Sequence, residues 1–169
     1  MNTIIFTDGS SRGNPGPGGW GSIVVSDKKI IELGGREAMT TNNRMELTSA
    51  IEALKTLESR TSQTLRIPIV IYSDSQYVIK GITEWIDGWV AKGWKNSQKK
   101  AVVNRDLWEK LLQASQNKKI VWKFVKGHAD TAGNVRCDEI ATRFADRENM
   151  KLYNSSRESY PFKEILKNL

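Results

Sequence analysis

Residues 67–74 read Ile-Pro-Ile-Val-Ile-Tyr-Ser-Asp, an almost continuous apolar run that ends in an aspartate. A strand that is apolar at nearly every position is covered on both faces, which is typical of a parallel strand inside a sheet. In open α/β sheets, ligands bind beyond the carboxyl ends of such strands. The stretch therefore predicts a central parallel strand that carries Asp74 to a functional edge.

Strands and helices are predicted on both sides of this run. Residues 3–7 indicate a first strand that ends near Asp8, and residues 22–26 and 29–33 predict two more strands that pair antiparallel with it. The remaining patterns predict helices over 47–57 (N-cap Asn42 or Asn43), 76–92 (interrupted at Gly81 and Gly88), 104–115 and from Asn134, and a strand over 119–126. This order predicts an α/β domain with a mixed five-stranded sheet and helices on both faces.

Composition limits the class of protein. The chain has 169 residues, room for one ordinary domain, which we place at residues 1–149, with a C-terminal tail at 150–169 that either packs back or is mobile. Lys and Arg number 26 against 19 Asp and Glu, a net charge of +7, which favours a polyanionic partner. The apolar runs are too short to cross a membrane, no secretory signal is visible, and one cysteine makes no intrachain disulfide. We expect a cytoplasmic protein.

Four carboxylates are placed where they can meet. Asp8 and Asp74 follow strands, while Glu46 and Asp138 lie near the starts of predicted helices. Each alone is an ordinary turn, cap or helix-dipole residue. If both helices have their first turns over the strand ends, the four converge, and like charges so close need a proton or a metal. Oxygen ligands suit Mg²⁺ or Mn²⁺, and a site for two such ions suits phosphodiester hydrolysis.

Five motifs occur in an order that resembles bacterial type 1 ribonuclease H, from about residue 3 to about residue 147. They are Thr7-Asp8-Gly9-Ser10, the stretch from Gly13 to Gly21, the stretch from Thr41 to Leu47, the stretch from Ser73 to Val78, and Val125-Lys126-Gly127-His128 with Arg136-Cys137-Asp138-Glu139. The resemblance implies the ribonuclease H fold and Mg²⁺-dependent cleavage of the RNA strand of RNA–DNA hybrids, with 5′-phosphate and 3′-hydroxyl ends.

The resemblance also implies roles for individual residues. Asp8, Glu46, Asp74 and Asp138 are then catalytic metal ligands for two Mg²⁺ ions, for which Mn²⁺ can substitute. His128, the only histidine, is the auxiliary group of a loop that helps protons or product leave. In the minor groove, where 2′-hydroxyls distinguish RNA from DNA, the expected residues are Gly9, Asn14, Asn42, Asn43 and Gln76.

Residues 84–100 resemble the basic protrusion of the family. Trp85, Trp89 and Trp94 are interleaved with lysines, among them Lys92 and Lys95. Lysines and indoles together can form a platform for a nucleic-acid strand, here the DNA strand. The alternative is an amphipathic helix whose tryptophans pack inward. Thr41 is expected in a pocket for one DNA phosphate, in which the family often has an asparagine where Gly88 stands. That departure predicts weaker binding with unchanged chemistry.

Two other functions remain open from the sequence. A non-catalytic module that binds RNA–DNA hybrids needs only the basic segment, but has no use for four acidic groups beside phosphate. A resolvase-like or transposase-like nuclease of the same fold lacks the stretch from Thr41 to Glu46 and the minor-groove residues. We expect a monomer with no obligate protein partner.

Overall fold

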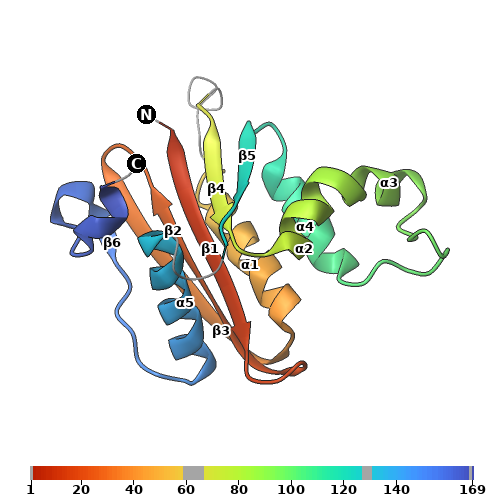
Figure 1. The fold of residues 1–169 in the computed structure, drawn as a ribbon, viewed down its shortest axis with the longest axis horizontal. Helices are drawn as coiled ribbons and strands as arrows, with labels where there is room; N and C mark the ends of the chain where they lie inside the picture. Colours follow the sequence, from red (N-terminus) through yellow and green to blue (C-terminus); the bar gives the residue numbers. More distant parts are fainter. Residues whose placement is uncertain (1, 59–66, 127–130, 168) are drawn as a thin grey trace.

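The computed structural model describes residues 2–58, 67–126, 131–167 and 169. Within them the chain forms one mixed sheet, flanked by helices and extended by a C-terminal tail (Figure 1). In chain order the elements are β1 (Thr3–Ser11), β2 (Gly16–Val25), β3 (Lys29–Thr40), α1 (Asn42–Lys55), β4 (Ile69–Ser73), α2 (Gln76–Lys80), the π-helix η2 (Gly81–Trp85), α3 (Ile86–Ala91), α4 (Arg105–Ser115), β5 (Ile120–Phe124), α5 (Ala132–Ala145), β6 (Asn154–Ser156), and the 3-10 helices η3 (Arg157–Ser159) and η4 (Lys163–Leu166).

The strand order is β5-β4-β1-β2-β3-β6. β4 lies between β1 and β5 and is parallel to both, so the apolar run forms a central parallel strand, as predicted. β1, β2 and β3 are antiparallel neighbours, also as predicted. The predicted sheet of five strands is one short, because β6 in the tail pairs with the outer edge of β3. β6 is a three-residue polar segment, so it has no apolar alternation by which to predict it.

Helices cover both faces of the sheet, and a separate core lies on each face. Ile5 of β1 packs in one core with Leu54 of α1 and Trp108 of α4. The adjacent Ile4 packs in the other core with Cys137 of α5, because successive side chains of a strand point to opposite faces. Figure 1 shows α5 across one face, with α2, η2 and α3 on one side and β6 on the other. The predicted layering is confirmed.

The first two strands are longer than the sequence pattern predicts. β1 continues to Ser11, and β2 begins at Gly16, inside the glycine-rich stretch that separates the two predicted strands. Glycine carries no side chain, so these positions give no strand pattern although their backbone continues the ladder. Asp8 therefore lies inside β1, opposite Gly21 of β2, and not at the end of the strand as expected.

The long helical segment after β4 is interrupted once, not twice. Gly81 begins the π-helical turn and packs against the Trp108 ring, where a Cβ at position 81 would lie 2.0 Å from the nearest ring carbon. Gly88, predicted as a second interruption, is inside α3, and a Cβ there would meet nothing within 4 Å. The interruption at Gly81 thus has a packing cause that is missing at Gly88.

The described part of the tail packs against the domain. Tyr160 and Ile165 are buried in the core beneath α5, together with strand residues such as Phe6. Near its end the tail forms the short 3-10 turn η4, in which Ile165 is the buried residue. None of the helices in the described residues is long and apolar enough to cross a membrane.

Candidate active site

The candidate site lies where β1 and β4 separate. The last paired residues of these strands are Phe6 and Tyr72, whose rings stack with centroids 5.3 Å apart. Asp8 and Asp74 each lie two residues further along their own chain segment. Beyond Phe6, β1 stays paired with β2, while β4 ends at Ser73. The parallel register therefore carries both aspartates to the same edge of the sheet.

Helix α1 brings Glu46 to this edge. Thr41 caps the helix, because its hydroxyl accepts a hydrogen bond from the Arg44 N–H at 3.3 Å, so the predicted caps Asn42 and Asn43 instead form the first turn. Three residues after Glu46, the buried Ser49 hydroxyl accepts the Asp8 N–H at 3.2 Å and donates to the Gly21 carbonyl at 2.6 Å. These hydrogen bonds hold α1 against both β1 and β2.

Gly9 sets how closely the helix approaches the strand. A Cβ at position 9 would lie 2.3 Å from the Glu46 nitrogen and 2.4 Å from the Met45 carbonyl carbon. Real Cβ atoms do not come so near to a backbone, so only glycine allows this separation. The Gly9 N–H also donates to the Asp8 Oδ1 at 2.8 Å. Gly9 thus lets Glu46 and Asp8 face each other.

Asp8, Glu46 and Asp74 form one cluster, in which one carboxylate oxygen from each lies within 4.8 Å of the others. Asp8 and Glu46 are buried, and Asp74 is half-buried. Burial, with the charges of Asp74 and Asp138, raises the pKa of Asp8 to about 7. Burial, followed by the charges of Asp8 and Asp74, raises the pKa of Glu46 well above its ordinary value. Without a counter-charge, this cluster favours bound protons.

The cluster fits a hard divalent cation. Its donors are carboxylate oxygens, the ligands that Mg²⁺ and Mn²⁺ prefer. Among the described residues, the buried Glu46 Oε2 has no hydrogen-bond partner, an open ligand position inside the protein. A divalent ion at this point would offset the burial and the repulsion that together raise both pKa values.

Asp138 lies near this cluster but outside it. It is half-buried in α5, which Thr131 caps by accepting the Asn134 N–H at 3.3 Å. Its charge contributes to the raised pKa of Asp8, yet the group of ligand atoms within 4.8 Å, among the described residues, contains only the other three. The structure thus brings together three of the four predicted carboxylates, with the fourth beside them.

Asn134 and Ser49 hold helices against the sheet, and the sequence pattern predicts neither of these contacts. Asn134, where the last helix is predicted to begin, is buried and donates from Nδ2 to the Thr7 carbonyl at 3.2 Å and to the Tyr72 carbonyl at 3.4 Å. These contacts fix the start of α5 at the point where β1 and β4 separate. The available signal was a small polar residue next to an apolar helical stripe, which is weak because caps show the same feature.

Several of the predicted minor-groove residues lie on the same segments as the carboxylates, at the starts of α1 and α2. Asn14, in the β1–β2 connection, accepts the Asn42 N–H at 3.3 Å and so joins that connection to the start of α1. Asn42, Asn43 and Gln76 are exposed, the last at the start of α2, two residues after Asp74. Their polar groups are therefore available beside the carboxylates. The predicted auxiliary residue, His128, lies outside the described residues.

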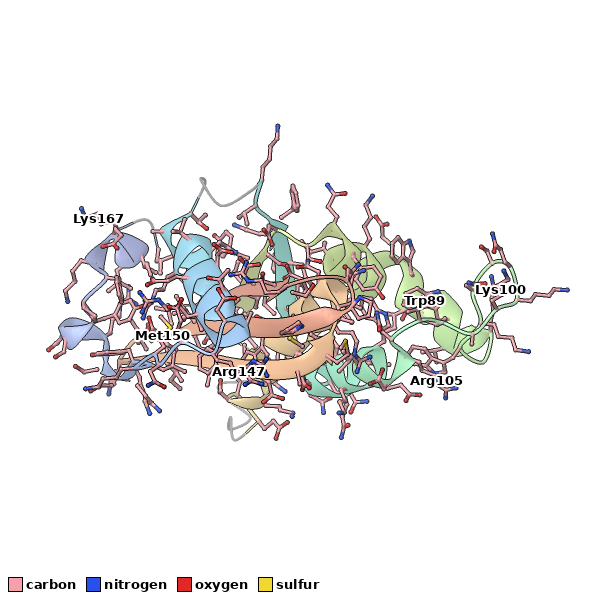
Figure 2. The ribbon with its side chains drawn as sticks, turned by 90° about the horizontal axis from the view of Figure 1, so that it is seen from below. Trp89, Lys100, Arg105, Arg147, Met150 and Lys167 are labelled. Carbon is pink, nitrogen blue, oxygen red and sulfur yellow. The ribbon has the colours of Figure 1, made fainter. Side chains whose placement is uncertain are left out.

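The predicted basic segment forms an arm at one end of the molecule. Figure 2 labels Trp89 and Lys100 on it, and Lys167 of the tail at the opposite end. Trp85, 39% exposed, and Trp89 line a surface pocket of about 290 Å³ with Gly88, Lys92 and Lys95. Trp89 also packs edge-on against the buried Trp108, at 5.3 Å between centroids. The arm thus has apolar anchors beneath and exposed lysines around an indole surface.

Comparison with known proteins finds relatives of one family. Residues 1–146 match the family model of RNase H. Ribonuclease H of Cyanothece sp. is 49% identical over 152 residues, covering 89% of this chain and 94% of that protein. Ribonuclease H of Geotalea uraniireducens is 50% identical over 141 residues, covering 83% and 92%.

Solved structures have the same fold. LC9-RNase H1, described as a type 1 RNase H with the type 2 active-site motif, superposes with a TM-score of 0.75 at 30% identity, covering 92% of this chain and 79% of that one. LC11-RNase H1, solved in complex with RNA/DNA hybrid, superposes with a TM-score of 0.66 at 21% identity, covering 86% and 98%. At 21% identity, the likeness to LC11-RNase H1 concerns the fold alone.

Proposed function

The chain belongs to the ribonuclease H family, and we propose from this premise that it hydrolyses the RNA strand of RNA–DNA hybrids with Asp8, Glu46, Asp74 and Asp138 as its catalytic carboxylates. The observation that carries the proposal is the cluster of Asp8, Glu46 and Asp74 within 4.8 Å, held inside a chain of net charge +7. A protein that only bound a polyanion would gain nothing from buried acidic groups beside the phosphates.

The carboxylates would hold two Mg²⁺ ions, or Mn²⁺ in their place. Bound there, such ions would supply an activated water and stabilisation of the leaving 3′-oxygen, which would give 5′-phosphate and 3′-hydroxyl ends. The open buried oxygen of Glu46 and the hydrogen bond from the Gly9 N–H to Asp8 support this role. Asp138 would complete the ligand set from α5. His128 would act on protons or on product release from its loop.

Substrate specificity would come from sugar chemistry and duplex shape. Asn14, Asn42, Asn43, Gln76 and the backbone of Gly9 would contact the 2′-hydroxyls of the RNA strand, an assignment supported by the exposure of Asn42, Asn43 and Gln76 and by the hydrogen bond that joins Asn14 to Asn42. The arm would hold the DNA strand, with lysines on phosphates and an indole against a sugar or base. Thr41, at the start of α1, would contact one DNA phosphate. These contacts do not read base sequence.

The test compares three labelled duplexes of one sequence: RNA–DNA hybrid, double-stranded RNA and double-stranded DNA. With Mg²⁺, we expect cleavage of the RNA strand of the hybrid alone. Asp8→Asn and Asp74→Asn are each expected to reduce the rate at least about a hundredfold, while Asp27→Asn, at an exposed position between β2 and β3, serves as the control. Hybrid binding without cleavage by the wild type would support the binding module instead. Cleavage retained by either site variant would overturn the ligand assignment.

We further infer a monomer that acts in the cytoplasm. The arm, the carboxylate cluster and the minor-groove residues all come from one copy of the chain, so no second copy is needed to complete the site. Sedimentation at the concentrations used for cleavage would test the monomer.

A further inference from the structure

The C-terminal tail reaches a carboxylate that is fully buried in the sheet. The Tyr160 hydroxyl donates to Glu32 Oε1 at 2.8 Å, and the Tyr153 N–H donates to Glu32 Oε2 at 3.0 Å. Glu32 belongs to β3, and its side chain has no exposed surface. Both tyrosines lie beyond residue 146, where the match to the family ends. The tail therefore supplies two of the donors that satisfy this carboxylate.

The same carboxylate holds α5. Arg136 Nε lies 2.8 Å from Glu32 Oε1, and Arg136 Nη2 lies 3.0 Å from Glu32 Oε2, a bidentate pair. A third nitrogen, Nη1, donates to Glu139 at 2.7 Å, and the Phe162 ring of the tail lies 4.2 Å from the guanidinium carbon. The Arg136 side chain is only 10% exposed. Its orientation is thus fixed from β3, from α5 and from the tail.

This arrangement bears on the candidate site, because Arg136 lies two residues before Asp138 in α5. The tail also reaches the first residues of the helix: Ile165 and Leu169 line a cavity of about 230 Å³ with Thr131 and Gly133. The tail therefore contacts α5 at Arg136 and lines a cavity beside the start of this helix. A shift of α5 along the sheet would change the distance from Asp138 to Asp8.

A buried ion pair is a poor source of stability, because desolvation of the two charges offsets most of their attraction. Apolar side chains of similar size would stabilise this interface at least as well. Directional hydrogen bonds differ from apolar contacts in that they fix one geometry. The Tyr160–Glu32–Arg136 network is therefore better suited to positioning than to stabilisation alone.

We propose that the tail positions Asp138 for metal binding, with Tyr160 and Glu32 as positioning residues that act through Arg136 on α5. The inference rests on the proposed function, in which Asp138 is a metal ligand. It adds a requirement from the part of the chain beyond the family match: the hydroxyl of Tyr160 is needed for full metal affinity, and its ring is needed for packing.

The experiment uses the full chain and Mn²⁺ as the probe, with binding measured by titration calorimetry and folding by thermal unfolding. Tyr160→Phe removes the hydroxyl and keeps the ring. Tyr153→Phe is the matched control, because Tyr153 packs on Tyr160 in the same aromatic cluster, but its hydroxyl donates to the Ser156 carbonyl and does not contact Glu32. We expect Tyr160→Phe to weaken Mn²⁺ binding about fivefold at a temperature where the protein is folded, and Tyr153→Phe to leave it unchanged.

A double variant tests the route through Asp138. Asp138→Asn alone is expected to weaken Mn²⁺ binding about tenfold, and Tyr160→Phe added to it is expected to weaken binding no further. If Tyr160→Phe lowers the unfolding temperature and leaves Mn²⁺ affinity unchanged, the tail is structural and the inference is wrong. If the effects of the two substitutions multiply, the tail acts by another route. If Asp138→Asn itself leaves affinity unchanged, the proposed ligand role of Asp138 fails, and the inference with it.

Discussion

The backbones of Gly9 and Glu46 are in direct contact across the strand–helix interface: a Cβ at position 9 would lie 2.3 Å from the Glu46 nitrogen. This contact is what makes a cluster of carboxylates possible, because it removes the side-chain layer that normally separates a helix from a strand. The cluster then follows from two independent constraints. The parallel register of β1 and β4 aligns Asp8 with Asp74, and the glycine contact brings Glu46 to them.

Gly9→Ala should therefore damage the site without removing any of its carboxylates. The new methyl group must displace α1 from β1, which lengthens the separation of Glu46 and Asp8 and lowers the free energy of unfolding by about 1–3 kcal/mol. We expect hybrid cleavage to fall at least about tenfold under conditions where the variant is folded. Urea unfolding and cleavage rates would check both. A variant with wild-type activity would mean that the contact is not needed.

Asp8→Asn should stabilise the protein in the absence of metal. The pKa of Asp8 is about 7 in the folded protein against an ordinary value of 3.8. Between these values the folded state binds more protons than the unfolded state, so the free energy of unfolding falls as pH rises. The loss is complete above about pH 7 and amounts to at most about 4 kcal/mol. We expect a gain of about 1–4 kcal/mol from Asp8→Asn near pH 8 and almost none near pH 4.

Urea unfolding of both proteins at the two pH values would measure this gain. Addition of Mn²⁺ at the higher pH should shrink it, because the ion relieves the same repulsion in the wild type. A gain of equal size at both pH values would contradict the explanation, because a packing effect of the amide does not depend on the ionisation of Asp8.

The convergence of Asp8 and Asp74 could be predicted from the sequence, because the apolar run at 67–72 identified a central parallel strand and register rules apply to such a strand. Glu46 could be assigned to a helix start, but its distance from Asp8 depends on Gly9, and a glycine in a strand pattern carries no signal of what approaches it. The extent of β1 was missed for a related reason: the glycines of β2, which continue the ladder, have no side chains to alternate.

The tail shows a different limit. Tyr160 is buried, with its hydroxyl hydrogen-bonded to Glu32, 128 positions away, and its ring packed on Tyr153 and Phe162 of the same tail. The spacing of the apolar residues in the tail does not identify what they pack against, so the sequence left both a packed and a mobile tail open. The ion pair of Glu32 with Arg136 spans 104 positions. Neither residue could be assigned a partner without the fold that places β3 beside α5.

Gly88→Ala and Gly81→Ala should have opposite effects on stability. Position 88 is exposed inside α3 and has open space around it, so alanine should stabilise the helix by about 0.5–1 kcal/mol. Position 81 faces the Trp108 ring, so alanine there should destabilise the protein by about 1–3 kcal/mol. Thermal unfolding of the two variants and the wild type would measure both changes in stability. A loss of stability in Gly88→Ala would show that α3 needs glycine for a reason other than space.

Lys92→Gln and Lys95→Gln should weaken hybrid binding and leave the chemical step intact. Both lysines are exposed and line the pocket beside the Trp85 indole on the arm, and none of the cluster carboxylates lines that pocket. If each contacts one phosphate, its loss removes roughly one unit from the slope of log affinity against log salt concentration. We expect KM for hybrid to rise and kcat to stay within about twofold. Lys29→Gln, at an exposed position at the start of β3, makes the same charge change away from the arm. If all three variants reduce the slope equally, the arm contributes only net charge, whereas a reduction confined to the arm variants locates the bound strand there.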